Sequence, residues 1–138
     1  MSVPVFVDTS AYYAVLDHTD PSHPAAAAAW GRLLDEMATE HLEALTHGGV
    51  VVETAALVQH RLGMTAVRTF LDEYVPASTV VWVDAELHDQ AAAALLAAGR
   101  RQVSLVDWTS FVVMRRRGIE QALAFDDHFL QQGFELFR

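Results

Sequence analysis

Residues 3–16 read VPVFVDTSAYYAVL, an apolar run followed by a polar triplet and a second apolar run. The β-branched and aromatic residues at positions 3–7 predict a buried strand. Asp8, Thr9 and Ser10 are typical of a helix start, and a short helix is expected over 11–16. Because a buried strand leads directly into a helix here, this stretch favours an α/β fold.

The alternation of strands and helices continues to the end of the chain. Apolar runs predict further strands, at 42–46, at 80–83 (as a buried strand) and at 122–125, before a last apolar stretch at 134–137. Apolar periodicity and capping residues predict helices, at about 25–40, 48–62, 65–74, 85–98 and 104–117, with a final helical turn near 128. Trp30, Phe70 and Trp82 are expected in the core. This order predicts a parallel-type α/β sandwich rather than a helical bundle.

Composition limits the classes of protein and of site. The chain has 138 residues, which predicts a single domain, and 52% of them are hydrophobic against 20% charged, which predicts a packed core. There is no cysteine, so disulfides, thiolate metal sites and a cysteine nucleophile are excluded. Any bound metal ion must therefore be held by oxygen or imidazole ligands.

Charge and hydropathy limit partners and location. Nine arginines stand against 18 acidic residues, a net charge of −9 with no lysine, which disfavours broad attraction to nucleic acid. A metal ion or a few clustered arginines can still allow action on a polyanion, and an acidic surface makes a basic partner protein plausible. Because no apolar run is long enough to span a bilayer and no basic segment precedes the first strand, we expect a cytoplasmic protein without membrane attachment.

Three aspartates stand where α/β proteins bind ligands. Asp8 follows the first strand, Asp126 follows the strand at 122–125, and Asp107 lies in the first turn of the helix that Ser104 opens. Ligands of an open parallel sheet bind at the carboxyl ends of its strands, where helices also begin. The sequence therefore predicts that these carboxylates meet at one edge of the sheet.

Glu53 is the fourth candidate. It lies among valines, alanines and leucine within the predicted 48–62 helix, and a buried carboxylate is costly unless a cation pairs with it. Since cysteine is absent and arginine scarce, Mg²⁺ or Mn²⁺ is the expected counter-charge. Four carboxylates around one or two such ions are typical of phosphodiester hydrolases, in which the ions activate water.

At these residues the sequence resembles a known family. The motifs are VFVDTS at 5–10, VE at 52–53 followed by Ala55 and Leu57, SLVDWTSFVVMR at 104–115, and AFDDHF at 124–129 followed by Gly133 and Phe134. In this order and spacing, they resemble the PIN-domain family and in particular its VapC-like toxins. Two positions depart from the family pattern. His47-Gly48 stands where a Ser/Thr-Asn pair is common, and Trp108 stands where a smaller residue is common.

The resemblance implies a three-layer α/β/α sandwich with a central, mainly parallel sheet, formed by 1–138 as a single PIN-like domain. It implies an endoribonuclease that depends on one or two Mg²⁺ or Mn²⁺ ions and acts as the toxin of a toxin–antitoxin pair. It also implies a homodimer, which the apolar stretch at 134–137 favours, and a cognate antitoxin. The implied catalytic and metal-binding residues are Asp8, Glu53, Asp107 and Asp126, supported by Thr9, Ser10 and Ser104.

Simpler interpretations exist for the three aspartates. Asp8 could only cap a helix, Asp107 could only complete the cap with Ser104, and Asp126 or its neighbour Asp127 could only favour a helix start. The fourth ligand could be Asp127, although the spacing to Phe129 favours Asp126.

The arginine run at 115–117 suits a helix end, and one of its members, with Arg115 as the candidate, could contact the RNA substrate. The alternative functions are a housekeeping PIN nuclease that processes RNA without an antitoxin, and a catalytically inert protein-binding module.

Overall fold

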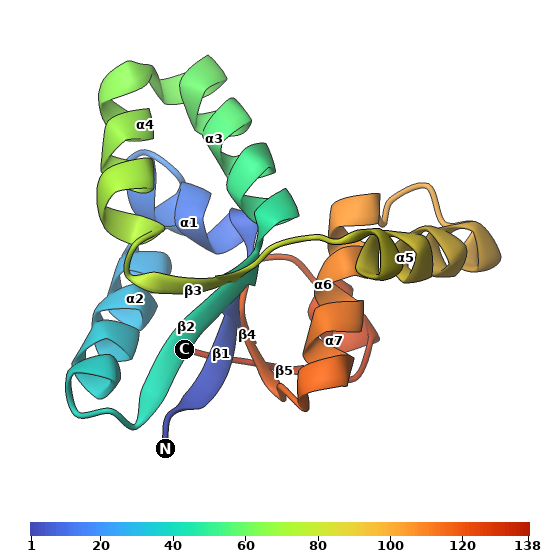
Figure 1. Cartoon of the computed structure of the whole chain (residues 1–138). Helices are drawn as coiled ribbons and strands as arrows, with labels where there is room; N and C mark the ends of the chain where they lie inside the picture. The colour runs from blue at the N-terminus through green and yellow to red at the C-terminus, as the bar shows by residue number, and fades with distance from the viewer.

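The computed structural model describes residues 1–138, and its centre is a five-stranded parallel sheet (Figure 1). Its strands are β1 (Val3–Val7), β2 (Leu42–His47), β3 (Ser78–Val81), β4 (Gln121–Leu123) and β5 (Glu135–Leu136). They lie in the order β3-β2-β1-β4-β5, and every neighbouring pair is parallel. The predicted α/β sandwich with a parallel sheet is confirmed.

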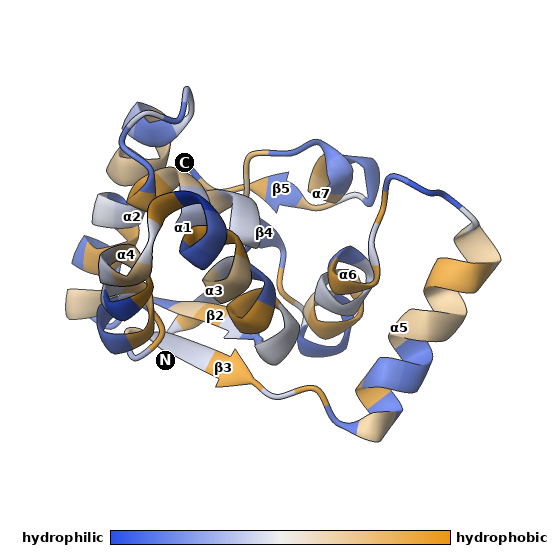
Figure 2. Ribbon diagram, turned by 90° about the horizontal axis from the view of Figure 1, so that it is seen from above, coloured by the Kyte–Doolittle hydropathy of each residue, from blue (hydrophilic) through white to orange (hydrophobic).

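Helices cover both faces of this sheet (Figure 2). One layer holds α1 (Thr9–Leu16), α2 (His23–Ala38), α3 (Gly48–Leu62), α4 (Met64–Thr69) and a short π-helical segment, η1 (Phe70–Tyr74). The other layer holds α5 (Ala85–Ala98), α6 (Leu105–Arg117) and α7 (His128–Gln131). None of these helices is both long and apolar enough to cross a lipid bilayer.

The order of the strands creates a switch point beside β1. The chain first builds the sheet outward from β1 through β2 to β3, and then returns to place β4 on the other side of β1. The registers Val5 to Ala44 and Phe6 to Ala122 fix β1 between its two neighbours. Because the connections of β1 and β4 leave toward opposite layers, their carboxyl ends border a crevice of the kind that binds ligands in open α/β sheets.

The core between the layers contains most of the large apolar side chains. Val5, Phe6 and Val7 of β1 are fully buried, and Tyr12 of α1 packs edge-to-face against Phe70. Trp30 and Phe70 are buried as the sequence predicts. These contacts fix β1 and α1 in the middle of the fold, so Asp8, the one residue between them, is held in place.

The structure differs from the sequence-based expectations at two apolar segments, residues 80–83 and 134–137. The strand predicted at 80–83 is the edge strand β3, which ends at Val81, and Trp82 lies beyond it with 66% of its surface exposed. An edge strand covers the core with one side only, so its apolar residues do not show that it is central. The C-terminal stretch is not a free apolar surface for dimerisation either, because β5 pairs with β4 and Phe137 is buried.

Element boundaries are otherwise close to those expected. The predicted helix at 48–62 coincides with α3, and glycines in the left-handed conformation end α5 and α6 at Gly99 and Gly118. The single helix expected at 65–74 consists instead of two segments, α4 and the π-helical η1. The backbone stays helical at Thr69 and Phe70, where one segment passes into the other.

Candidate active site

Asp8 is the buried carboxylate at the centre of the site. It caps α1, since its Oδ2 accepts hydrogen bonds from the Ser10 backbone N–H at 3.1 Å and from the Ser10 hydroxyl at 2.7 Å. Only 3% of its surface is exposed. Burial, followed by the negative charge of Asp126, raises the pKa of Asp8 from 3.8 to about 7. Asp8 therefore caps a helix and also belongs to a group of mutually repelling carboxylates.

Ser10 connects Asp8 to the loop after β4. Its hydroxyl oxygen accepts a hydrogen bond from the Phe125 backbone N–H at 2.9 Å while the hydroxyl donates to Asp8. Thr9 has a different role, because its hydroxyl oxygen accepts from Thr54 of α3 at 3.1 Å. Of the two predicted supporting residues, Ser10 holds the carboxylate and Thr9 joins α1 to α3.

Asp107 reaches the site from the first turn of α6. Ser104 and Asp107 form the predicted capping box, in which the Asp107 carboxylate accepts the Ser104 backbone N–H at 2.9 Å. The same Oδ2 atom lies 3.4 Å from Nδ1 of His128. The capping role and the site role are thus compatible, because one carboxylate oxygen has room for both neighbours.

Asp126 and His128 complete a compact acidic cluster. Asp126 Oδ1 accepts the His128 backbone N–H at 3.0 Å and lies 3.8 Å from His128 Nδ1. One ligand atom each from Asp107, Asp126 and His128 lies within 4.8 Å of the others. Burial raises the pKa of Asp126, and the charge of Asp107 adds to this rise. Asp127 is exposed and makes no capping hydrogen bond, so Asp126 is the residue that faces the cluster.

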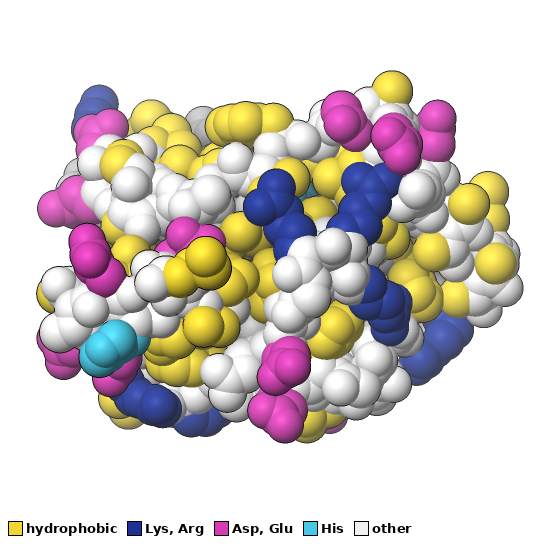
Figure 3. Space-filling view, turned by 60° about the horizontal axis from the view of Figure 1, so that its bottom comes forward, with side chains coloured by type: hydrophobic (Ala, Val, Ile, Leu, Met, Phe, Trp, Pro, Cys, Tyr) yellow, Lys and Arg dark blue, Asp and Glu magenta, His cyan; other side chains and the backbone are white.

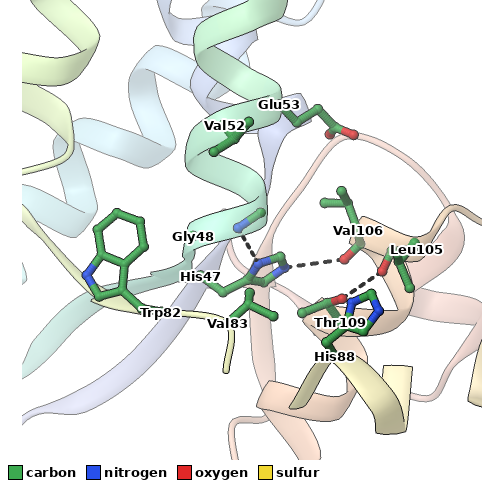
Figure 4. A pocket seen from close by; sticks show the side chains of 11 residues that line it. His47, Gly48, Val52, Glu53, Trp82, Val83, His88, Leu105, Val106 and Thr109 are labelled. Atoms are coloured by element: carbon green, nitrogen blue, oxygen red, sulfur yellow. Dashed lines mark hydrogen bonds between the residues drawn. The ribbon is translucent and has the colours of Figure 1, made fainter. Parts of the chain in front are cut away.

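Glu53 differs from what the sequence predicts. Its side chain is exposed, so the expectation of a carboxylate enclosed by apolar neighbours is wrong. The error arises because Glu53 and the preceding Val52 both lie on the outer face of α3, while Thr54 is buried. Figure 4 shows the Glu53 carboxylate turned away from Trp82, on the side where α6 begins. Its role as a ligand stays a prediction.

Comparison with known proteins gives the family. The PIN domain matches residues 5–135, nearly the whole chain. The chain belongs to the PIN-domain family. The 23S rRNA-specific endonuclease VapC20 of two Mycobacterium tuberculosis strains, CDC 1551 and H37Rv, is 36% identical over 133 residues, covering 94% of this chain and 95% of VapC20.

Solved structures of other proteins have a similar fold. The crystal structure of M. tuberculosis VapC20, described as a sarcin-ricin loop cleaving toxin, superimposes with a TM-score of 0.81 at 34% identity, covering 94% of this chain and 95% of that one. FitAcB from Neisseria gonorrhoeae has a TM-score of 0.67 at 13% identity, with 97% and 96% covered. PAE2754 from Pyrobaculum aerophilum has a TM-score of 0.64 at 19% identity, with 99% and 90% covered. The last two show the fold alone.

His47 is a residue of this PIN domain whose role the sequence did not reveal. Its buried ring caps α3, because Nδ1 accepts the Gly49 backbone N–H at 3.0 Å. The proton must then lie on Nε2, which donates to the Ser110 hydroxyl at 2.9 Å in α6. Burial lowers the pKa of His47 to about 4, which keeps the ring neutral. His47 therefore joins the starts of α3 and α6 on either side of the site.

Arg115 is held at the far end of α6. Its guanidinium donates to the side-chain oxygen of Gln132 at 2.8 Å and lies over the ring of Phe134. Eight residues of helix separate it from Asp107, which is about 12 Å at 1.5 Å per residue. These contacts give Arg115 a packing role, and its predicted contact with substrate stays a prediction.

The acidic cluster of this PIN domain has the chemistry of a divalent-cation site. Asp8, Asp107 and Asp126 repel one another, as the raised pKa of Asp8 shows. Nδ1 of His128 is buried and has no hydrogen-bond partner, which leaves a nitrogen directed at the same carboxylates. Three carboxylates and a nitrogen, without sulfur ligands, suit a hard cation such as Mg²⁺ or Mn²⁺. The sequence places His128 beside Asp126 in the AFDDHF motif, but it belongs to no HxH or HExxH pattern that would mark it as a ligand.

Proposed function

We propose that this PIN domain is a Mg²⁺- or Mn²⁺-dependent endoribonuclease and the toxin of a toxin–antitoxin pair. The observation that carries the proposal is the convergence of Asp8, Asp107 and Asp126 at the switch point between β1 and β4. The 36% identity to a 23S rRNA-specific endonuclease over almost the whole chain supports the reaction class.

Asp8, Asp107 and Asp126 would hold the ion or ions, with Glu53 approaching from α3 as the fourth carboxylate and His128 as a further neighbour. A divalent ion bound there supplies a Lewis acid for the phosphodiester and lowers the pKa of water. The chain itself contributes position. Ser10 orients Asp8, and the capping box orients Asp107. Because Asp8 is buried, its charge acts at close range with little screening by water.

The substrate proposed for this chain is ribosomal RNA, by similarity to VapC20. A homodimer and a cognate antitoxin are proposed on the same similarity. An acidic toxin with a net charge of −9 fits an antitoxin whose contact segment is basic.

The test is sequencing of RNA ends after brief induction of the wild-type protein and of an Asp126→Asn variant, with Asp127→Asn as the matched control. We expect new ends in ribosomal RNA with the wild type and with Asp127→Asn, and none with Asp126→Asn. Cleavage that spares growth, at sites of normal RNA processing, would indicate the housekeeping nuclease instead. No cleavage by purified wild type with either metal ion would leave only the inert binding module.

A further inference from the structure

A pocket of about 470 Å³ opens beside the acidic cluster (Figure 4). Its walls come from the start of α3, from the linker between β3 and α5, and from the start of α6, with the buried ring of His47 at its base. Glu53 lies on its rim, and Val106 of its α6 wall is the neighbour of Asp107 in the chain. The pocket therefore shares its α6 wall with the helical turn that carries Asp107.

Trp82 forms the wall opposite α6 and is unusually exposed. Its indole has 66% of its surface in solvent, and Val52 and Val83 of the same pocket are 67% and 37% exposed. The indole lies against Gly48 so closely that a Cβ atom there would be 2.6 Å from the ring. The absence of a side chain at Gly48 thus allows this placement. An exposed indole that the fold does not use is a surface for a flat, apolar ligand.

On the other side of Trp82 lies a second, smaller pocket of about 220 Å³, whose charged lining residues are Arg116, Arg117 and Asp84, the last of which caps α5. Arg116 is paired with Glu86 at 3.6 Å and bonds to Gln90, whereas Arg117 has no hydrogen bond or ion pair within the protein. On the face where the strands begin and α6 ends, arginine side chains gather although the chain is acidic overall (Figure 3). Arg117 is thus a free cation beside the exposed indole.

These groups form a path across the edge of the sheet. Asp107 lies in the first turn of α6 and Arg117 ends the helix, about 15 Å away along its axis. Trp82 lines both the pocket beside the first turn of α6 and the pocket beside its end. Aromatic side chains that stack bases, combined with cations that pair phosphates, are how proteins hold single-stranded nucleic acid. The pocket has ample room for one nucleobase, and His88 and Thr109 supply polar groups at its wall for the edge of the base.

We propose that this pocket is a nucleobase site for single-stranded RNA, in which a base next to the cleaved phosphodiester stacks on Trp82 and a following phosphate pairs with Arg117. The inference rests on the proposed ribonuclease function and adds where the substrate is held. A polyanion is favoured over a protein occupant because Arg117 is unpaired and because the path starts at the reacting centre. His88 and Thr109 then determine which base is preferred.

The test measures binding of fluorescein-labelled single-stranded RNA octamers by anisotropy with Mg²⁺, in an Asp126→Asn background to prevent cleavage. A second octamer carries abasic sites in place of its bases. Trp82→Ala should weaken binding of the normal octamer about 5- to 100-fold and leave the abasic one unchanged, while Trp82→Phe keeps most of the affinity. Arg117→Gln should weaken both octamers and flatten the salt dependence of log K by about 0.7. Arg68→Gln, an exposed arginine on α4, is the matched control and should bind as the parent does.

Equal affinity of Trp82→Ala and its parent for the normal octamer would overturn the nucleobase site. A Trp82→Ala variant that turns a dimer into a monomer in light scattering, with RNA affinity unchanged, would assign the pocket to a protein interface and also overturn it. Cleavage by the otherwise wild-type protein separates the two proposals. If it cleaves RNA and Trp82→Ala cleaves with the same KM, only the nucleobase site fails, whereas a wild type that neither binds nor cleaves RNA removes both.

Discussion

Replacing Asp8 by asparagine should stabilise the metal-free protein while removing its metal response. The raised pKa of Asp8, about 7 against 3.8 for a free aspartate, means that the folded state binds a proton more tightly than the unfolded state. The stabilisation that comes from the raised pKa of Asp8 is therefore complete below pH 3.8 and is lost as pH rises toward 7. At about 1.4 kcal/mol per pH unit, the raised pKa of Asp8 lowers the free energy of unfolding by about 4 kcal/mol at pH 8, where folded Asp8 is ionised, and by about 2 kcal/mol at pH 5, where it is protonated.

The Asp8→Asn side chain is uncharged and keeps an oxygen that can accept the two hydrogen bonds from Ser10. Its amide can donate to the neighbouring carboxylates, so most of the cost of the charge should be relieved. At about 3 °C per kcal/mol for a chain of this size, we expect the Tm in EDTA at pH 8 to rise by about 10 °C, with a smaller rise at pH 5. Differential scanning calorimetry at the two pH values measures both.

Addition of Mn²⁺ at a hundredfold excess over Kd should stabilise the wild type by about 3 kcal/mol and so raise its Tm, and it should leave Asp8→Asn nearly unchanged. Asp127→Asn is the control, since that carboxylate is exposed and should alter neither quantity. An Asp8→Asn variant that is less stable than the wild type in EDTA at pH 8 would refute the reasoning that the carboxylates repel one another in the absence of a cation.

The remaining predictions concern catalysis, pH and the linker. Asp126→Asn should lower the rate of RNA cleavage about 100-fold or more while Asp127→Asn keeps it, as single-turnover kinetics would show; equal losses in both would contradict the assignment of Asp126. When pH falls from 6.5 to 4, the free energy of unfolding of the wild type should fall by about 3 kcal/mol relative to that of His47→Asn, whose side chain can still cap α3. The folded pKa of His47 is depressed to about 4, so the stabilisation by its neutral ring is complete above pH 6.5 and is lost as pH falls toward 4. Urea unfolding of both proteins at both pH values checks this, and an equal loss of unfolding free energy in the two proteins would contradict it. Gly48→Ala should displace Trp82, because a Cβ would lie 2.6 Å from its ring, and so lower RNA affinity with little loss of Tm; unchanged octamer anisotropy would argue against this.

Local signals in the sequence were sufficient for the elements and for three of the carboxylates. The cap residues Asp84 and Ser104 and the closing glycines Gly99 and Gly118 predicted α5 and α6 to within a residue. Asp8 and Asp107 were placed by the same rule, because a cap is formed within one turn and depends on few neighbours. These interactions are local, so the sequence contains them without knowledge of the rest of the fold.

The exposure of side chains to solvent and the contacts between residues far apart in the chain could not be predicted from local signals. Apolar neighbours in the sequence suggested burial for Glu53 and Trp82, but α3 turns the glutamate outward and β3 is an edge strand. His128 belongs to no HxH or HExxH pattern, and its approach to Asp107 joins residues 21 positions apart. His47 bridges α3 to Ser110 of α6, 63 residues later.

The sequence by itself therefore determined the α/β order, the caps and the acidic residues at the strand ends, because each depends on neighbours within a few positions. Only the tertiary structure decided that β4 returns beside β1, which brings Asp126 to Asp8, and that β3 lies at the edge of the sheet with Trp82 beyond it in solvent. The reason is physical: repulsion between charges and access to water depend on distances in space, and those distances are set when the layers pack.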